Sequence, residues 1–189
     1  MVDFTGLPHG LPVPVDDGAA DHLAGTPMPA LTLTSTAGEQ VRLAELGSGR
    51  TIIYIYPLTG RPGVDLPAGW DEIPGARGCS TEACDFRDHF QLLRAAGAAG
   101  VYGLSSQDTD YQREAVERLS LPFPVLSDGD FSLGTALSLP TFTASGAGRL
   151  YKRLTLIVRD GTIEHVFYPI FPPNTHAQQV LAWLGANPA

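Results

Sequence analysis

TIIYIY at residues 51–56 and GCSTEACDFRDHFQLLRAAGAAGVYGLS at residues 78–105 predict a strand, a helix and a second strand. The first run is rich in β-branched and aromatic residues, as is typical of a buried central strand. In the second run, apolar residues recur at helical spacing from Cys79 to about Ala96, and Val101–Ser105 reads as the next strand. The helix carries its apolar residues on one face, namely Ala83, Phe86, Phe90, Leu93 and Ala96. This order predicts parallel strands joined by a right-handed crossover.

The rest of the chain continues the alternation of strands and helices. Alternating apolar residues on both sides of Ala37-Gly38 predict a small N-terminal hairpin. We expect further helices at 109–119, 131–137 and 175–184. We expect further strands at 123–127, 153–158 and 162–168, the last two joined by a turn at Asp160-Gly161. The sequence therefore predicts an α/β fold, with a mixed β-sheet flanked by helices and an N-terminal β-hairpin.

The chain divides into an arm and one domain. Residues 1–24 carry several Pro, Gly and Asp residues and little periodicity, so we interpret them as an irregular arm. Residues 25–189 are predicted to form a single domain. Within it, residues 59–77 are rich in Gly and Pro and form a long inserted loop. Loops of this length in compact domains are usually functional.

Composition excludes several classes of protein. The net charge of −8 argues against a protein that binds the phosphate backbone of nucleic acids. Apolar residues make up 43% of the chain, enough for a packed core, yet no apolar run predicts a membrane span. The first residues lack a basic start and an apolar run, so we expect a cytoplasmic location. Two cysteines in a reducing compartment favour a catalytic pair over a structural disulfide.

Cys79 stands where a helix N-terminus can activate it. A thiol with the ordinary pKa of about 8.5 is only about 3% thiolate at pH 7. The free N–H groups and the dipole at the start of a helix favour the anion, so we expect the pKa of Cys79 to be lowered. Ser80 or a neighbour is expected to cap the helix. The carboxylates of Glu82 and Asp85 oppose the thiolate, which predicts a nearby cation that offsets them.

The spacing of the two cysteines carries a further constraint. On an ideal helix, Cα atoms at i and i+5 lie roughly 8–9 Å apart. A disulfide needs a Cα separation below about 7 Å. A bond between Cys79 and Cys84 therefore requires the start of the helix to unwind. This requirement suits a cycle in which Cys79 first becomes a sulfenic acid and Cys84 condenses with it after the helix opens.

Several segments, taken in order, resemble the peroxiredoxin family. The resemblance is greatest to its PrxQ, or bacterioferritin-comigratory, branch, whose second cysteine lies five residues after the first. It covers roughly residues 24 to 185. The segments are Tyr56-Pro57, GTPMP at 25–29, GCSTEACDFRD at 78–88, LPFPVLSD at 121–128 and RLTLIVRDG at 153–161.

The resemblance implies a thioredoxin-like fold and a thiol-dependent peroxidase. Cys79 would be the peroxidatic cysteine, Cys84 the resolving cysteine and Arg153 the cationic partner. The substrate would be hydrogen peroxide or an alkyl hydroperoxide, and the reductant would be thioredoxin or a similar dithiol protein. The resemblance implies no metal, haem or flavin cofactor, and the protein would act as a monomer or homodimer.

Physical chemistry supports Arg153 as the cation. A guanidinium beside the sulfur lowers the thiol pKa and stabilises charge on the leaving oxygen. Lys152 and Arg159 are the rival cations. Alternation along the strand places Arg153 on the same face as Thr155 and Lys152 on the opposite face.

The sequence departs from the family pattern at one position. The family has Thr or Ser three residues before the peroxidatic cysteine, but this chain has Ala76 there. Either Thr59 folds back into the place of the missing hydroxyl, or backbone N–H groups suffice. The insertion, with Trp70 and Arg77, is also expected to reshape the peroxide pocket or the docking surface for the reductant.

Other interpretations remain open at this level. The chain could be a thiol–disulfide oxidoreductase on the same fold, or a non-catalytic redox sensor or binding module. The two cysteines could also be small buried apolar residues without chemistry. Arg87 is interpreted as a structural ion-pair partner, and Trp70 as the anchor of the loop. The histidines are scattered, and no pair has metal-ligand spacing.

Overall fold

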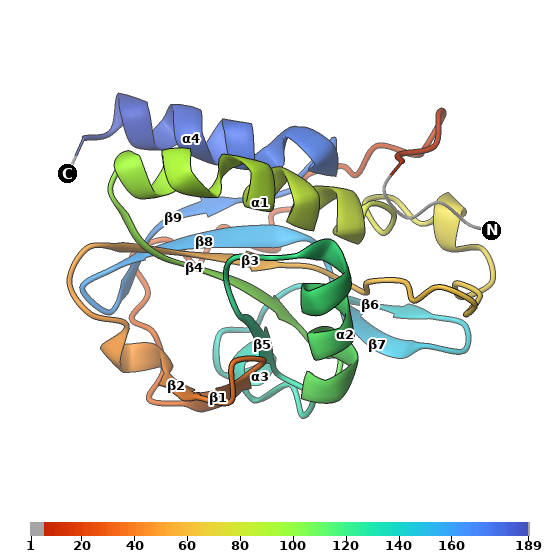
Figure 1. Ribbon diagram of the computed structural model, residues 1–189, viewed down its shortest axis with the longest axis horizontal. Helices are drawn as coiled ribbons and strands as arrows, with labels where there is room; N and C mark the ends of the chain where they lie inside the picture. The colour runs from red at the N-terminus through yellow and green to blue at the C-terminus, as the bar shows by residue number, and fades with distance from the viewer. Residues whose placement is uncertain (1–5, 189) are drawn as a thin grey trace.

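The computed structural model describes residues 6–188 (Figure 1). The strands are β1 (Thr32–Ser35), β2 (Gln40–Arg42), β3 (Arg50–Ile55), β4 (Ala98–Ser105), β5 (Val125–Ser127), β6 (Thr141–Ala144), β7 (Gly148–Tyr151), β8 (Leu154–Arg159) and β9 (Thr162–Phe167). The α-helices are α1 (Cys79–Ala95), α2 (Thr109–Leu119), α3 (Ser132–Ala136) and α4 (His176–Ala186). Short 3₁₀ turns occupy η1 (Leu43–Glu45), η2 (Trp70–Glu72) and η3 (Pro173–Thr175).

Seven strands form one mixed sheet in the order β2-β1-β5-β4-β3-β8-β9. β3 pairs in parallel with β4, and β4 with β5, whereas the other neighbours are antiparallel. The predicted strand–helix–strand unit and the N-terminal hairpin are therefore confirmed, and with them the mixed sheet flanked by helices. A second sheet contains only β6 and β7.

β3 runs through the middle of the sheet with every residue buried. Because side chains alternate along a strand, Ile53 and Ile55 join the core on one face, while Ile52 and Tyr54 join the core on the other. α1 and α4 lie side by side over the second face (Figure 1). The first face is covered by α3, the β1–β2 hairpin and the end of the arm, where Leu23 is fully buried. Residues 6–24 otherwise contain turns, without a strand or helix.

The hairpin of β6 and β7 was not predicted, and it is what holds the insertion. Trp70 and Ala76 of the insertion pack against Ala144 and Leu150 of the hairpin in a separate buried cluster. Trp70 is only 3% exposed, so it anchors the loop as interpreted from the sequence. Residues 59–77 thus form a fixed wall against the hairpin.

The sequence analysis placed the Asp85 carboxylate against the Cys79 thiolate. In the structure this carboxylate instead links α1 to the start of α4. Its carboxylate accepts hydrogen bonds from the backbone N–H of Ala177, at 2.7 Å, and from Nε2 of Gln178, at 3.1 Å. The first N–H groups of a helix lack partners within the helix, and a carboxylate there also suits the dipole. Asp85 therefore stabilises the packing of the two helices that cover this face of the sheet.

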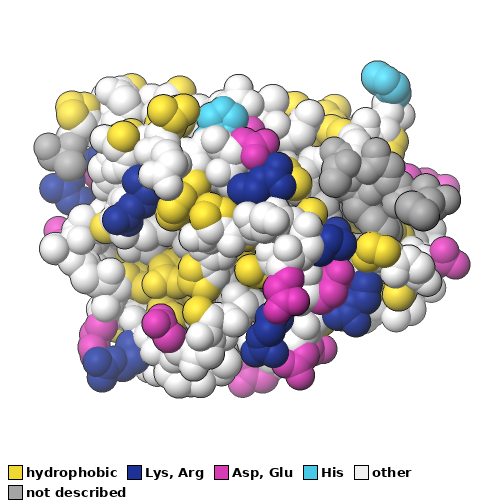
Figure 2. Space-filling model, in the orientation of Figure 1, with side chains coloured by type: hydrophobic (Ala, Val, Ile, Leu, Met, Phe, Trp, Pro, Cys, Tyr) yellow, Lys and Arg dark blue, Asp and Glu magenta, His cyan; other side chains and the backbone are white. Residues whose placement is uncertain are grey.

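The molecular surface is mixed in charge on the face that carries α2. Lys and Arg side chains lie next to Asp and Glu side chains there (Figure 2). Within α2, Arg113 pairs with Asp110 at 2.6 Å and Arg118 pairs with Glu114 at 2.7 Å. Across residues 6–188, the helices are too short or too polar to span a membrane.

Asp85→Ala is expected to lower the free energy of unfolding by about 1–3 kcal/mol, because it leaves buried N–H donors of α4 without an acceptor. Asp88→Ala is the matched control, since Asp88 lies on the exposed side of the same helix. We expect the control to change the free energy by less than about 0.5 kcal/mol. Urea unfolding followed by circular dichroism measures both, and equal effects would contradict the assigned role of Asp85.

Candidate active site

Cys79 is the first residue of α1 and lies at the carboxyl end of β3. The residue before it, Gly78, has φ of 104°, in the left-handed region that glycine tolerates. A Cβ at this position would come within 2.4 Å of Pro173 and 2.9 Å of Leu7, so only glycine fits. The expected side-chain cap by Ser80 or a neighbour is wrong, because Gly78 is the N-cap and has no side chain to cap the helix. The first turn of α1 therefore has no side-chain acceptor at its N-cap.

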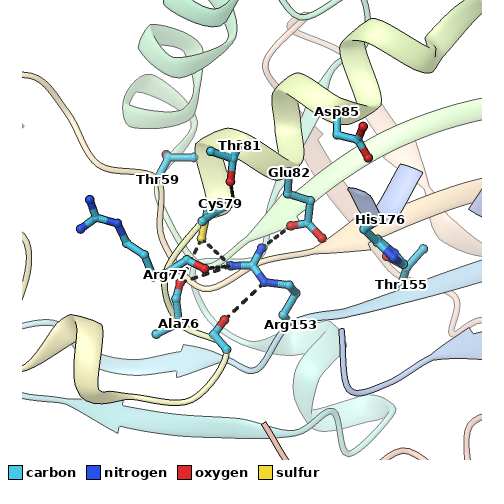
Figure 3. A network of polar contacts seen from close by, with 12 residues as sticks. Thr59, Ala76, Arg77, Cys79, Thr81, Glu82, Asp85, Arg153, Thr155 and His176 are labelled. Atoms are coloured by element: carbon cyan, nitrogen blue, oxygen red, sulfur yellow. Dashed lines mark hydrogen bonds and ion pairs between the residues drawn. The ribbon is translucent and has the colours of Figure 1, made fainter. Parts of the chain in front are cut away.

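Arg153 immediately precedes β8, and its guanidinium reaches the sulfur (Figure 3). Nη2 lies 3.2 Å from Sγ of Cys79, and Nη1 forms an ion pair with Glu82. The Arg153 side chain is buried, so its charge depends on these partners. Its remaining acceptors are the backbone oxygens of Gly75 (3.3 Å), Ala76 (3.2 Å) and Arg77 (3.3 Å). The segment before Cys79 thus wraps around the cation.

The two rival cations lie elsewhere. Lys152 contacts Asp17 of the N-terminal arm at 2.5 Å. Arg159, at the far end of β8, lies 3.8 Å from both Asp160 and Glu164. The structure therefore brings Arg153 to Cys79 and leaves the other two in surface ion pairs.

Glu82 is the second buried acid of the site. It is fully buried, and its Oε1 has no hydrogen-bond partner among the described residues. Burial raises the pKa of Glu82 to about 7, with Arg153 acting in the opposite direction. The predicted cation that offsets this carboxylate is thus the same Arg153 that contacts the sulfur. One buried guanidinium serves two acidic groups.

The pKa of the Cys79 thiol lies above its ordinary value in this conformation. Burial is the largest cause; Arg153 and the backbone N–H of Leu58 lower the pKa, and Glu82 raises it. The thiol also lies 3.6 Å from the backbone oxygen of Ala76, as a hydrogen-bond donor. The expectation that the helix N-terminus lowers the pKa of Cys79 is therefore wrong for this conformation. The loss of hydration raises the thiol pKa more than the nearby positive charge lowers it.

Thr59 is buried close to the site, but its hydroxyl has another partner. Its Oγ1 donates to Oε1 of Gln107 at 3.0 Å, and its backbone N–H donates to the same oxygen at 2.9 Å. The described residues contain no hydrogen bond between Thr59 and Cys79. The backbone N–H of Leu58 lies near the sulfur instead. Backbone N–H groups were the alternative to Thr59 for replacing the hydroxyl that is absent at Ala76. Sequence reasoning gave no signal for Gln107.

Cys84 lies on the same helix, is half-buried, and is a free thiol like Cys79. Arg87 lowers its pKa, although burial leaves the net shift upward. The Arg87 side chain donates to Asp88 and to the backbone oxygen of Leu119, both at 2.8 Å. Arg87 thus has the structural contacts that the sequence interpretation assigned to it.

His176 is a buried residue that the sequence analysis did not single out. Its Nε2 lies 2.9 Å from the hydroxyl of Thr155, and burial lowers its pKa to about 4. It is therefore neutral at pH 7 and adds no second cation behind Arg153. Within residues 6–188, no three His, Cys, Asp or Glu residues are grouped closely enough to hold a metal ion.

The fold and the site together define a class of protein. A buried cysteine at a helix N-terminus, with a guanidinium on its sulfur and a second cysteine on the same helix, is a thiol redox centre. The sequence model of the Redoxin family matches residues 23–181. Peroxiredoxin Bcp of Escherichia coli (strain K12) is 30% identical over 164 residues, which cover 85% of this chain and 94% of the relative. The chain therefore belongs to the redoxin family, in the peroxiredoxin Q and Bcp branch.

Other relatives agree with this membership. The chloroplastic peroxiredoxin Q of Gentiana triflora is 29% identical over 161 residues. The match covers 85% of this chain but only 65% of the plant protein, less than two thirds of its length. The crystal structure of peroxidoxin BcpB from Mycobacterium tuberculosis has a TM-score of 0.70 at 24% identity, covering 89% of this chain and 100% of that one. Xanthomonas campestris peroxiredoxin Q has a TM-score of 0.64 at 23% identity, covering 94% and 98%. The structural matches establish the thioredoxin-like fold.

Arg153→Gln is expected to raise the pKa of the Cys79 thiol, because it removes the cation that lowers it. Glu82→Gln is expected to lower that pKa, because it removes the buried carboxylate that raises it. The pH dependence of alkylation by iodoacetamide reports both shifts in a Cys84→Ser background, where Cys79 is the only thiol.

Lys152→Gln is the matched control for the charge of Arg153, since Lys152 is the adjacent residue and bonds to Asp17. It should leave the alkylation profile unchanged. Shifts of the same sign in Arg153→Gln and Glu82→Gln would contradict the opposing roles.

Proposed function

We propose that this chain is a thiol peroxidase that reduces hydroperoxides through Cys79, with Cys84 as the resolving cysteine. The observation that carries the proposal is the 3.2 Å contact between Nη2 of Arg153 and Sγ of Cys79. A guanidinium in this position stabilises the thiolate and the negative charge that develops on the leaving oxygen. Membership of the peroxiredoxin branch supports the same reaction.

In the first step, the Cys79 thiolate attacks the terminal oxygen of the peroxide. An S–O bond forms as the O–O bond breaks, which gives a sulfenic acid and an alkoxide or hydroxide that takes up a proton. Because the thiol pKa is raised in the closed site, the thiolate is a minor form at neutral pH. Arg153 and the N–H of Leu58 favour this form, and we propose that they replace the hydroxyl missing at Ala76.

In the second step, Cys84 attacks the sulfenic sulfur, an S–S bond forms and water leaves. The first turn of α1 must open for this step, because both cysteines lie within one helix. Opening breaks the hydrogen bond from Thr81 Oγ1 to the oxygen of Gly78, 2.8 Å in length, and separates Glu82 from Arg153. A dithiol protein such as thioredoxin then reduces the disulfide and restores both thiols.

The proposed substrates are hydrogen peroxide and alkyl hydroperoxides. A solved structure of the Xanthomonas campestris bacterioferritin comigratory protein, 21% identical, is described in terms of its alkyl peroxide reduction activity. The proposed compartment is the cytoplasm, where cellular reductants keep a cysteine pair reduced between turnovers.

A redox-sensing role without turnover is the second candidate. One observation favours it: burial raises the pKa of Cys79 and slows a reaction that needs the thiolate. The rate of oxidation by hydrogen peroxide separates the two roles. Oxidation several orders of magnitude faster than that of a free thiolate favours the peroxidase, and a rate like that of an ordinary thiol favours the sensor.

Cys79→Ser is expected to reduce peroxide consumption to the uncatalysed rate, because it removes the thiol that contacts Arg153. Cys84→Ser should retain one rapid oxidation and accumulate sulfenic acid in place of the disulfide. Stopped-flow tryptophan fluorescence and mass spectrometry of the product measure both. Intact turnover in Cys79→Ser would rule out the proposed chemistry.

Thr59→Val is expected to lower the rate of Cys79 oxidation by less than about 10-fold, because the hydroxyl bonds to Gln107 and the Leu58 N–H serves the sulfur. Removing a donor that bonds the reacting oxygens typically costs about 10²–10³-fold. Single-turnover oxidation measures the difference, with Thr59→Ser as the conservative control. A loss of the larger size, restored in Thr59→Ser, would show that Thr59 itself binds the peroxide.

A further inference from the structure

The space beside the Cys79 sulfur is very small. A cavity of about 10 Å³, which is room for about one water molecule, has Cys79 in its lining. Its walls come from three segments: the end of β3 and start of the insertion, the middle of the insertion, and the start of α1. The residues that line it are Leu58, Gly60, Leu66, Arg77, Gly78, Cys79 and Ser80.

Geometry of the reaction decides which part of a peroxide occupies this cavity. The terminal oxygen must lie against the sulfur, so the remainder of the molecule extends outward past the walls. For hydrogen peroxide that remainder is one hydroxyl group, whereas for a tertiary alkyl hydroperoxide it is a branched carbon group. Leu66 lines both the cavity and a neighbouring hollow, so a group that extended from the cavity toward that hollow would meet its side chain.

The wall formed by Leu66 is fixed in place. Leu58 and Leu66 both pack against the buried cluster that contains Trp70 and Leu150. Moving Leu66 aside would therefore disturb the contact between the insertion and the β6–β7 hairpin. A bulky group that pushed Leu66 inward would overpack this cluster, which is destabilising.

The hollow beyond Leu66 does not suit an apolar group. It has a volume of about 300 Å³ and includes the charged residues Asp71, Glu72 and Arg77 in its lining. Arg77 and Asp71 form an ion pair of 3.1 Å, and the Arg77 side chain points away from Arg153 (Figure 3). An alkyl group placed there would displace water from charged groups and offer them no partner, which is unfavourable.

A larger apolar cavity of about 460 Å³ lies nearby, but Cys79 is not among the residues that line it. Gly75 and Arg153 form its wall toward the site, where the backbone of residues 75–77 wraps around the guanidinium. That backbone separates the cavity from the sulfur. The cavity therefore gives no room for the organic group of a peroxide held at Cys79.

We infer that the site selects hydrogen peroxide over bulky organic hydroperoxides, with Leu66 of the insertion as the specificity-determining residue. The inference rests on the proposed peroxidase function and narrows its substrate class. Replacing Leu66 by alanine removes the side chain that blocks the outward path. It is expected to change the relative rates of large and small peroxides.

The test measures single-turnover oxidation of Cys79 by hydrogen peroxide, ethyl, tert-butyl and cumene hydroperoxides. Each rate is divided by the rate of the same peroxide with free cysteine, which removes intrinsic reactivity. In the unmodified protein, the normalised rate should fall along this series, by at least about 10-fold from hydrogen peroxide to cumene hydroperoxide. Leu66→Ala should raise the cumene-to-hydrogen-peroxide ratio by about 10-fold.

Val64→Ala is the matched control, since Val64 lies in the same loop, is exposed, and does not line the cavity. It should leave the ratio unchanged. Equal normalised rates along the series in the unmodified protein would overturn the inference while leaving the peroxidase intact, even if Leu66→Ala fails to fold. Oxidation by every peroxide at the rate of a free thiol would instead overturn the proposed function.

Discussion

The guanidinium of Arg153, buried between Cys79 and Glu82, is the group on which the geometry of the site depends. A buried cation is stable only when its charge and its donors find partners. Arg153 meets this requirement with the sulfur, one carboxylate and the backbone oxygens of residues 75–77. The same requirement fixes the path of the chain just before α1, and so places Cys79 at the end of β3. The position of the nucleophile and the shape of the loop follow from one constraint.

Burial has two opposing consequences for the chemistry. It strengthens the interaction of the sulfur with Arg153, because electrostatic interactions grow as water is excluded. It also raises the pKa of both Cys79 and Glu82, since each acid loses hydration. The two acids share one guanidinium, so their protonation is coupled, and the charge of Glu82 affects how readily the thiol ionises. Opening of the first turn of α1 would release this coupling and expose the sulfur to Cys84.

The insertion of residues 59–77 contributes both to the packing of the β6–β7 hairpin and to the walls around Cys79. Trp70 and Leu66 pack in the cluster formed with the β6–β7 hairpin, and Leu66 also lines the cavity at Cys79. At its other end, Gly75 and Ala76 supply oxygens to Arg153. The loop therefore lines the cavity at Cys79, and it also supplies hydrogen-bond acceptors to the Arg153 guanidinium. A segment with this double role is held by packing, although it contains only one short 3₁₀ turn.

The sequence by itself determined the order of strands and helices around the central sheet, because the periods of apolar residues in 51–56 and 79–96 reflect local geometry. The resemblance to the peroxiredoxin family singled out Cys79, Cys84 and Arg153, and strand alternation separated Arg153 from Lys152. Only the tertiary structure decided that Asp85 contacts α4, that Thr59 bonds to Gln107, and that the β6–β7 hairpin holds the insertion. It also decided the direction of the Cys79 pKa shift. Cys79 loses its hydration only when segments distant in the sequence pack around it. A local sequence pattern therefore cannot predict this effect on its pKa.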